Sequence, residues 1–565
     1  MTSLPEPISF DYVIVGGGSA GCLLANRLSE DKAVTVCLVE AGRSDLGLVE
    51  SILTRVPAAI PFLLQSPKYN WGYKFEKDQR CGGRELLMPR GRLLGGSSAL
   101  NGMIYVRGHR LDYDGWKALG NDGWGYDDVL PYFKKSEHWH GPPSEYHGTS
   151  GELDVSEPRS PHPLSVNFVA AAASLQCPSN NDVNGPQQDG AGIIHLTQRK
   201  GERMSSARAF LHPVRFRPNL TILTNTRVEK IRFSGRRAVG VTAWSNGPLL
   251  LSARKEVILS AGSIASPHLL LLSGVGPAAH LEQHGVDIVH HLPGVGQSLQ
   301  DHVNVSLFYG SDRRDLYSLT GRTLVGNILA PLKYLLFRRG PLTSNLFEAA
   351  AYVRSQPGLS QPDLQIVFGP GLFPLEGAMD DAGTHHGFTF NVTFLHPRSR
   401  GSISLHSTAP ESAPRIVGNV LSHREEVDAL TRGIRWSRQL VASGAMKAGD
   451  CFELPRTAHR QTDSELEAYI MNAASTCLHP TSTCRMGVDE AAVVDNELKV
   501  RGLTGLRVVD ASVMPRIPAG NTNAPTIMVA EKAAALIRQS NTERYVHVAA
   551  ADDLLNADPT VAALR

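Results

Sequence analysis

The sequence predicts an α/β fold, α+β over the whole chain, that opens with a parallel strand–helix–strand unit. Tyr12–Val15 has the apolar pattern of a buried strand. Residues 22–28 follow with helical character, and a second apolar strand, Val34–Val39, comes next. Parallel strands need a crossover connection, usually a helix, so this order of elements indicates a βαβ unit.

Three glycines, Gly16, Gly18 and Gly21, occupy the turn between the first strand and the helix in G-x-G-x-x-G spacing. The first allows the tight turn, the second lets the backbone approach a pyrophosphate, and the third lets helix and strand pack closely. The helix N-terminus then offers unpaired N–H groups and a positive dipole end to the phosphates. With both strands and the helix in place, the motif predicts a dinucleotide-binding site.

The second strand ends on Glu40, where an acid can accept hydrogen bonds from ribose hydroxyls. The same carboxylate would repel the 2′-phosphate of NADP, so this position disfavours NADP as the ligand. On the motif alone, FAD and NAD both stay open as the dinucleotide.

Composition narrows the class of protein. The 565 residues are 42% apolar and 19% charged with a net charge of +2, which is typical of a globular protein. No basic stripe is visible, which argues against a nucleic-acid partner. The seven cysteines are scattered without a C-x-x-C pair, and no signal-peptide pattern precedes the first strand, so we expect a cytoplasmic protein. Cys477 and Cys484 flank a histidine in a spacing that matches no common zinc site, so no metal is predicted.

One apolar stretch, Leu324–Phe337, is followed by Arg338 and Arg339. It is shorter than the run of about 18 apolar residues that a membrane-spanning helix needs. Two interpretations stay open for it. It is either a core or lid helix interrupted at Pro331, or a segment that lies on a membrane surface and places the protein at the periphery of the inner membrane.

Glycines and serines concentrate again in residues 91–108, GRLLGGSSALNGMIYVRG. Such a run favours a loop whose backbone can press against a flat ligand. The apolar residues around the glycines argue against a simple surface loop. We therefore expect this loop to contact the bound dinucleotide.

Four segments of the chain resemble the glucose–methanol–choline (GMC) oxidoreductase family. Residues 91–108 resemble the first signature of the family, and residues 262–277, GSIASPHLLLLSGVGP, resemble the second. Residues 478–487, LHPTSTCRMG, and 508–534, VVDASVMPRIPAGNTNAPTIMVAEKAA, resemble its active-site region. The chain looks most like the bacterial choline-dehydrogenase-like and aliphatic-alcohol-dehydrogenase-like members.

The resemblance implies FAD as the cofactor. It also implies a Rossmann-type FAD-binding domain interleaved with a substrate domain. The antiparallel sheet of the substrate domain would cover the isoalloxazine ring of FAD. Some members attach FAD through a histidine at the position of Leu100, and leucine has no nucleophilic nitrogen, so we expect non-covalent FAD. The expected segments are 1–158, 215–308 and 475–540 for the FAD domain, 159–214 and 309–474 for the substrate domain, and 541–565 for a C-terminal extension. Three interpretations stay open for this extension: a short helix, a contact between subunits of an oligomer, or a floppy tail. The sequence does not reveal the oligomeric state.

The resemblance also assigns cofactor contacts residue by residue. The glycine loop and the acid would hold the ADP half, the second glycine-rich segment would run along the flavin, and Val228 would touch the adenine through its backbone. The full set is Gly16, Gly18, Ser19, Ala20, Gly21, Glu40, Ala41, Arg92, Gly95, Gly96, Ser98, Asn101, Gly102, Met103, Ile104, Val228, Asp510, Ala511, Asn521 and Thr522.

Oxidation of an alcohol requires a base for the hydroxyl proton and an acceptor for the hydride. A histidine with a pKa near the working pH suits the first task, and the catalytic histidine of the family falls on His479. The second active-site position of the family falls on Asn521, whose amide can donate to the substrate oxygen. Asn523 and Pro525 then predict a helix start whose positive end faces the flavin.

Three residues are candidates for substrate contact: Tyr105, Glu348 and Leu478. Two roles stay open for Glu348: it either binds a cationic group of the substrate or is purely structural. Two positions stay open for Tyr105: it either lines a substrate pocket or lies in the protein core. We expect a small primary, apolar alcohol to be oxidised to the aldehyde, with a quinone or another non-oxygen acceptor. The alternatives are a choline-type dehydrogenase, an alcohol oxidase that uses O2, and an FAD-containing lyase of the hydroxynitrile lyase type.

Overall fold

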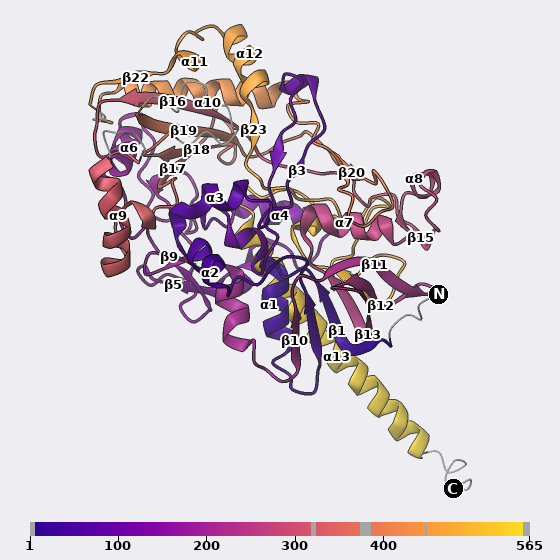
Figure 1. Cartoon of the computed structure of the whole chain (residues 1–565). Helices are drawn as coiled ribbons and strands as arrows, with labels where there is room; N and C mark the ends of the chain where they lie inside the picture. The colour runs from indigo at the N-terminus through magenta and orange to yellow at the C-terminus, as the bar shows by residue number, and fades with distance from the viewer. Residues whose placement is uncertain (1–5, 318–323, 373–385, 447–448, 558–565) are drawn as a thin grey trace.

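The structure, a computed structural model, describes residues 6–317, 324–372, 386–446 and 449–557 (Figure 1). Two seven-stranded sheets organise the described chain, and each has its own apolar core. The predicted fold class, an FAD-binding-type α/β unit joined to an antiparallel sheet, is confirmed.

The first sheet is mostly parallel and has the strand order β10-β2-β1-β13-β12-β11. Helix α1 (Ser19–Leu28) connects β1 to β2, which run parallel, so the predicted βαβ unit is present. The long strand β13 pairs with β12 along its first half and with β24 near its end. The strands are β1 (Ile8–Val15), β2 (Val36–Val39), β10 (Leu220–Leu223), β11 (Arg227–Ser234), β12 (Arg237–Trp244), β13 (Pro248–Leu259) and β24 (Leu506–Val508).

The second sheet is antiparallel throughout, with the order β22-β16-β19-β18-β17-β7 and β23 paired to β16. Helices α6 (Pro163–Ser174), α10 (Arg424–Ala442) and α12 (Asp463–Ala473) pack on it (Figure 1). The strands are β7 (Gly190–Ile193), β16 (Val303–Ser311), β17 (Ala349–Val353), β18 (Leu364–Gly369), β19 (Gly387–Phe394), β22 (Cys451–Glu453) and β23 (Ser475–Thr476).

The strands also bear on the expected domain boundaries. The expected FAD segments 215–308 and 475–540 include the first part of β16 and all of β23, yet both strands belong to the second sheet. We therefore propose that the chain passes between the two units just before Val303 and just after Thr476.

Shorter elements complete the described chain. The helices are α2 (Leu48–Arg55), α3 (Ile60–Gln65), α4 (Arg110–Ala118), α5 (Tyr126–Ser136), α7 (Gly262–Leu272), α8 (Ala278–Gln283), α9 (Leu324–Phe337) and α11 (Pro455–Ala458). The two-stranded pairs are β3 (Tyr73–Lys74) with β4 (Leu87–Met88), β5 (Glu137–Trp139) with β6 (Leu153–Val155), β8 (Gln198–Arg199) with β9 (Glu202–Arg203), β14 (Val275–Gly276) with β15 (His290–His291), and β20 (Ser402–Ser404) with β21 (Arg415–Val417).

The last helix, α13, runs from Asn523 to Ala557 and packs against α1. Asn523 is its first helical residue, whereas the sequence predicted it as the residue before the helix. Its side-chain oxygen accepts a hydrogen bond from Ser19 Oγ at 2.8 Å, which ties the start of α13 to the start of α1. The backbone of the expected C-terminal extension continues α13 as far as Ala557, and this part projects away from the body (Figure 1).

Candidate active site

The glycine motif forms a turn that tolerates no side chain at two positions. Gly16 has φ +103°, and a Cβ there would lie 2.5 Å from the carbonyl oxygen of Ser260. A Cβ on Gly21 would lie 1.9 Å from the carbonyl oxygen of Gly16. The close approach of α1 to β1 therefore depends on glycine, and it leaves the first N–H groups of α1 free for a phosphate.

The Glu40 carboxylate lies beside this turn. Its Oε2 accepts from the backbone N–H of Gly17 at 2.8 Å, and its Oε1 accepts from that of Gly42 at 2.7 Å. Burial raises the pKa of Glu40 to about 7, although these two N–H donors and Arg92 work in the opposite direction. A buried carboxylate at the end of β2 fits the task of accepting hydrogen bonds from ribose hydroxyls.

The second glycine-rich segment is joined to the first by its backbone. The Gly95 N–H donates to the Gly17 carbonyl at 2.8 Å, and a Cβ on Gly96 would lie 2.7 Å from Gly18 Cα. At Gly102 nothing lies within 4 Å of a would-be Cβ. This cradle of closely apposed backbone with open space beside it fits an extended dinucleotide such as FAD.

Two side chains hold the second glycine-rich segment, the flavin-side loop of the cradle, in place by hydrogen bonds. Ser98 Oγ donates to the Gly95 carbonyl and accepts from the Ser206 N–H. Asn101 Oδ1 accepts from the Met103 N–H and from the guanidinium of Arg203. Their hydroxyl and amide oxygens are thus engaged within the protein, so we expect this loop to meet the flavin through its backbone and the remaining N–H groups.

The other predicted cofactor residues differ in their burial and in the partners of their side chains. Asp510 directs its carboxylate to the protein: Oδ2 accepts from the Gly262 N–H at 2.8 Å and from Ser266 Oγ at 2.6 Å. It therefore positions the loop between β13 and α7. Four others are buried, namely Ala20, Ile104, Val228 and Thr522, and three are half-buried, namely Ala41, Arg92 and Ala511. Their contacts with the cofactor stay predictions.

Two imidazoles form the chemical centre of the site. His479 Nδ1 lies 3.1 Å from His302 Nδ1, and His479 Nε2 lies 3.0 Å from Asn521 Nδ2. The rings of His302 and His479 meet edge to face, at an interplanar angle of 87°. The structure thus brings together the two predicted catalytic residues, His479 and Asn521, and places His302 against His479.

The hydrogen bonds determine where the ring protons lie. His302 Nε2 lies 3.1 Å from the carbonyl oxygen of Leu395, which can only accept, so this nitrogen carries the proton. Burial lowers the pKa of His302 to about 3, so the ring is neutral and its Nδ1 is an acceptor. His479 Nδ1 must then carry a proton to donate to it, which leaves the lone pair of His479 on Nε2, facing the Asn521 amide.

The surroundings keep His479 neutral and oriented. Burial lowers its pKa well below the usual range, and the neighbouring His302 and Arg90 add to this effect. Asp301 Oδ1 accepts from the His479 backbone N–H at 2.9 Å, while Arg90 donates to the Leu478 carbonyl at 2.6 Å. The segment that carries His479 is therefore held by hydrogen bonds on both sides.

The three predicted substrate residues lie in different environments. The Glu348 carboxylate is fully buried and accepts from four donors: the His162 N–H and the hydroxyls of Ser165, Tyr317 and Ser344. Such an arrangement favours a structural role for Glu348.

Tyr105 and Leu478 also differ from each other. Tyr105 is buried in the core of the first sheet. Leu478 is half-buried, has φ +63° and directly precedes His479, so it lies beside the imidazole pair.

Sequence reasoning missed His302. It follows Gly294 and Gly296 in the loop immediately before β16, and this loop was not singled out as chemistry-bearing. Its position follows from the register of the second sheet, in which Val303 pairs with Thr476 and the Cys477 N–H donates to the His302 carbonyl. A prediction of the β16–β23 pairing would have been needed to find it.

Comparisons with known proteins agree along the chain. The N-terminal model of the GMC oxidoreductase family matches residues 10–304, and its C-terminal model matches residues 397–530. An alcohol dehydrogenase (acceptor) of Pseudomonas putida is 42% identical over 94% of this chain and 95% of its own length. An oxygen-dependent choline dehydrogenase of Brucella ovis is 41% identical over 93% of this chain and 94% of its own length.

Solved structures show the same architecture. Pyridoxine 4-oxidase from Mesorbium loti superposes with a TM-score of 0.82 at 31% identity, covering 94% of this chain and 99% of that protein. Formate oxidase from Aspergillus oryzae superposes with a TM-score of 0.85 at 29% identity, covering 95% of this chain and all of that protein.

Proposed function

Because this chain belongs to the GMC oxidoreductase family, we propose that it oxidises a primary, apolar alcohol to the aldehyde with His479 as the base. The family match confirms two sequence predictions: FAD is the cofactor, and the enzyme is an oxidoreductase of CH–OH donors. The contact of 3.0 Å between His479 Nε2 and the Asn521 amide is the observation that carries the assignment of the base.

The substrate hydroxyl displaces the direct contact of 3.0 Å between His479 Nε2 and Asn521 Nδ2 and takes up both partners. Its proton points to the His479 Nε2 lone pair, and its own lone pair accepts from Asn521 Nδ2. As His479 takes the proton, the Asn521 N–H stabilises the negative charge that develops on the oxygen. Bound FAD supplies the acceptor for the hydride that leaves the carbon.

His302 acts through His479 as a positioning residue. Its Nδ1 accepts the His479 Nδ1 proton, so the basic lone pair stays on Nε2, on the side of Asn521. If the His479 ring adopted the other tautomer, Nε2 would carry the proton and could not accept the one from the substrate.

The internal hydrogen bonds of Glu348 support an apolar substrate over a cationic one. Recognition of a quaternary ammonium needs a free carboxylate or an aromatic cage, and both Glu348 oxygens are satisfied by internal donors. The choline dehydrogenase relative keeps choline as the second candidate substrate. The lyase alternative has no support in the comparisons.

A quinone acceptor at a membrane surface is the second part of the proposal. Helix α9 buries Ala330 and Tyr334, but it leaves Leu335, Leu336 and Phe337 between 63% and 67% exposed. Basic side chains at 338 and 339 follow this apolar face, as in segments that lie on anionic membrane surfaces.

A second exposed apolar group lies nearby. The turn at Pro57–Ala59, between α2 and α3, contacts the turn that follows α9. Leu48 of α2 is 80% exposed and Phe62 of α3 is 69% exposed. Among the described residues no single helix is long and apolar enough to cross a membrane, and Leu48–Arg55 with Pro57–Gln65 passes this test only as a pair bent by 107°.

Anaerobic mixing of the FAD-loaded enzyme with a panel of alcohols tests the proposal. We expect linear primary alcohols to bleach the flavin absorbance faster than choline, and a quinone to restore it faster than air. The His479→Ala variant with full FAD content is the control. Bleaching by choline alone would favour the choline alternative, and bleaching at equal rates in wild type and variant would reject His479 as the base.

A further inference from the structure

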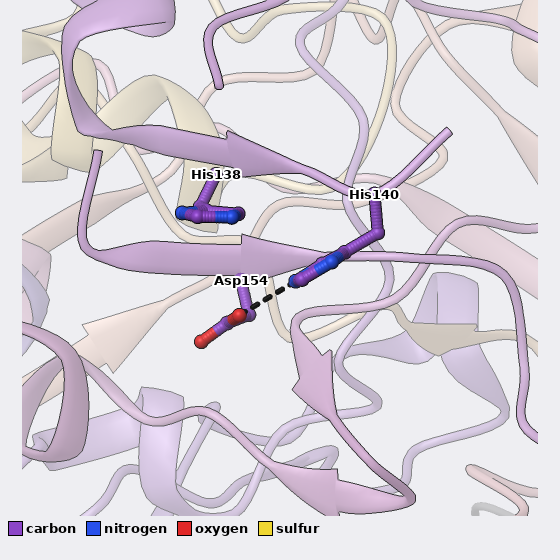
Figure 2. Close-up of side chains that lie close together, drawn as sticks. All are labelled: His138, His140 and Asp154. Atoms are coloured by element: carbon purple, nitrogen blue, oxygen red, sulfur yellow. Dashed lines mark hydrogen bonds and ion pairs between the residues drawn. The ribbon is translucent and has the colours of Figure 1, made fainter. Parts of the chain in front are cut away.

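Two imidazoles and a carboxylate converge on the surface at the parallel strands β5 and β6. The register places His138 directly opposite Asp154. Side chains alternate along a strand, so Glu137 and Trp139 point into the protein, whereas His138 and His140 share the outer face with Asp154 (Figure 2).

The three side chains are close enough to share one ligand. His140 Nε2 lies 2.6 Å from Asp154 Oδ1, and one possible ligand atom from each residue lies within 4.8 Å of the others. Bonds of about 2.1 Å to a zinc ion place ligand atoms roughly 3–4 Å apart, so only small side-chain rotations are needed to close the site. This is the one such group of three within the described residues.

Burial and hydrogen bonding also favour a bound ion. The Asp154 side chain is 9% exposed and therefore held in place, whereas the His140 side chain is 42% exposed and accessible. The ring nitrogens of His138 have no hydrogen-bond partner among the described residues, and its ring lies 4.8 Å from that of His140. One cation competes for the carboxylate: Arg199 Nε lies 4.0 Å from Asp154 Oδ2, on a largely exposed side chain that can turn to solvent.

We infer that His138, His140 and Asp154 bind a divalent transition-metal ion such as Zn²⁺. Two imidazole nitrogens with one carboxylate suit zinc, nickel or copper, whereas calcium and magnesium prefer all-oxygen sites. Three protein ligands leave a coordination position for water. The sequence predicted no metal, and the inference concerns residues that it did not single out.

Such an ion would join the two ends of the connection between His140 and Leu153. The inner face of β5 contributes to the core, where Glu137 pairs with the Arg107 guanidinium at 2.7 Å. An ion that binds the folded but not the unfolded chain stabilises the fold by mass action. We therefore assign the ion a stabilising role, separate from the His479 chemistry.

Calorimetric titration of the chelator-treated, FAD-loaded enzyme with Zn²⁺ tests this inference. We expect one tight equivalent that is weakened at least tenfold in His140→Ala and in Asp154→Asn. His212→Ala is the matched control, because His212 Nε2 also bonds a carboxylate, Asp45, at 2.9 Å, but outside any group of three. This variant should still bind one equivalent of Zn²⁺ tightly. That result would distinguish binding at the proposed site from adventitious binding by other histidines.

Two further measurements do not depend on activity. Zn²⁺ should raise the melting temperature of wild type and His212→Ala but not of His140→Ala. Co²⁺ in its place should give a visible absorption spectrum of a nitrogen- and oxygen-ligated ion. Equal Zn²⁺ affinity in wild type and both site variants, or no tight equivalent in wild type, would overturn the inference.

Discussion

The dinucleotide cradle and the imidazole pair are assembled in opposite ways. The glycine turn, the helix and the acid of the cradle all lie between Gly16 and Gly42, so neighbours in sequence are neighbours in space. The imidazole pair joins residues 177 positions apart, and Asn521 lies 42 positions beyond His479. This part of the cradle needs one βαβ unit, whereas the pair needs the second sheet in register and docked on the first.

This difference separates cofactor binding from chemistry. A substitution in the cradle should remove FAD, and with it every activity. A substitution in the pair should leave FAD in place and change only the rate or its pH dependence. The substitutions below test this separation.

Gly21→Ala should have the largest effect. The added Cβ would lie 1.9 Å from the Gly16 carbonyl oxygen, so α1 and β1 would have to separate. We expect loss of most bound FAD, measured as the flavin-to-protein ratio after gel filtration. Gly115→Ala in α4 is the control, because nothing lies within 4 Å of its Cβ position. Full FAD content in Gly21→Ala would contradict the role of this close contact.

His479→Ala should retain FAD and reduce it slowly. Removal of the base should cost about 100-fold or more in the rate of flavin reduction by alcohol, measured by anaerobic stopped flow. Because the ring contacts only His302 and Asn521 through its nitrogens, the melting temperature should change little. A near-normal rate would exclude His479 as the base.

His302→Leu should have an intermediate effect. Leucine cannot accept the His479 Nδ1 proton, so both tautomers of His479 become populated, and we expect about a tenfold slower flavin reduction. His302→Gln is the matched variant, since its amide oxygen can accept that proton and its amide nitrogen can donate to the Leu395 carbonyl. Equal rates in the two variants would show that the tautomer is set by other contacts.

Leu336→Ser combined with Phe337→Ser should alter binding to membranes and not the chemistry. Loss of two exposed apolar side chains from α9 should reduce flotation with anionic liposomes several-fold. Flavin reduction by alcohol should be unchanged. Phe216→Ser removes another largely exposed aromatic side chain and should not affect flotation. Wild-type enzyme that does not float would contradict membrane docking by α9.

The smallest expected change is in the pH profile of wild-type enzyme. The pKa of His479 is lowered, so the ring is neutral and basic at all pH values above the ordinary histidine range. The rate of flavin reduction should therefore be flat from neutral to mildly alkaline pH and fall only on the acid side, as His479 becomes protonated. A rate that still rises tenfold per pH unit through neutrality would show a higher pKa in the working enzyme.

The FAD-binding half of the molecule was readable from local patterns. The apolar strand, the glycine spacing and Glu40 lie within one short stretch, and each has a conformational or chemical reason of its own. The flavin-side loop was predicted in the same way, because glycine and serine mark where the backbone comes close to a ligand. His479 and Asn521 were assigned by resemblance, and the structure places their side chains 3.0 Å apart.

What the sequence by itself determined is therefore the fold class and the FAD cofactor, and it supplied the prediction of the cofactor cradle and of the catalytic pair. Only the tertiary structure decided that His302 meets His479, that Glu348 is surrounded by four donors, and that His138, His140 and Asp154 share one face. The physical reason is that these contacts depend on which strands pair and in which register. Backbone hydrogen bonds between distant segments set that register, and a change of one residue would turn each side chain to the opposite face.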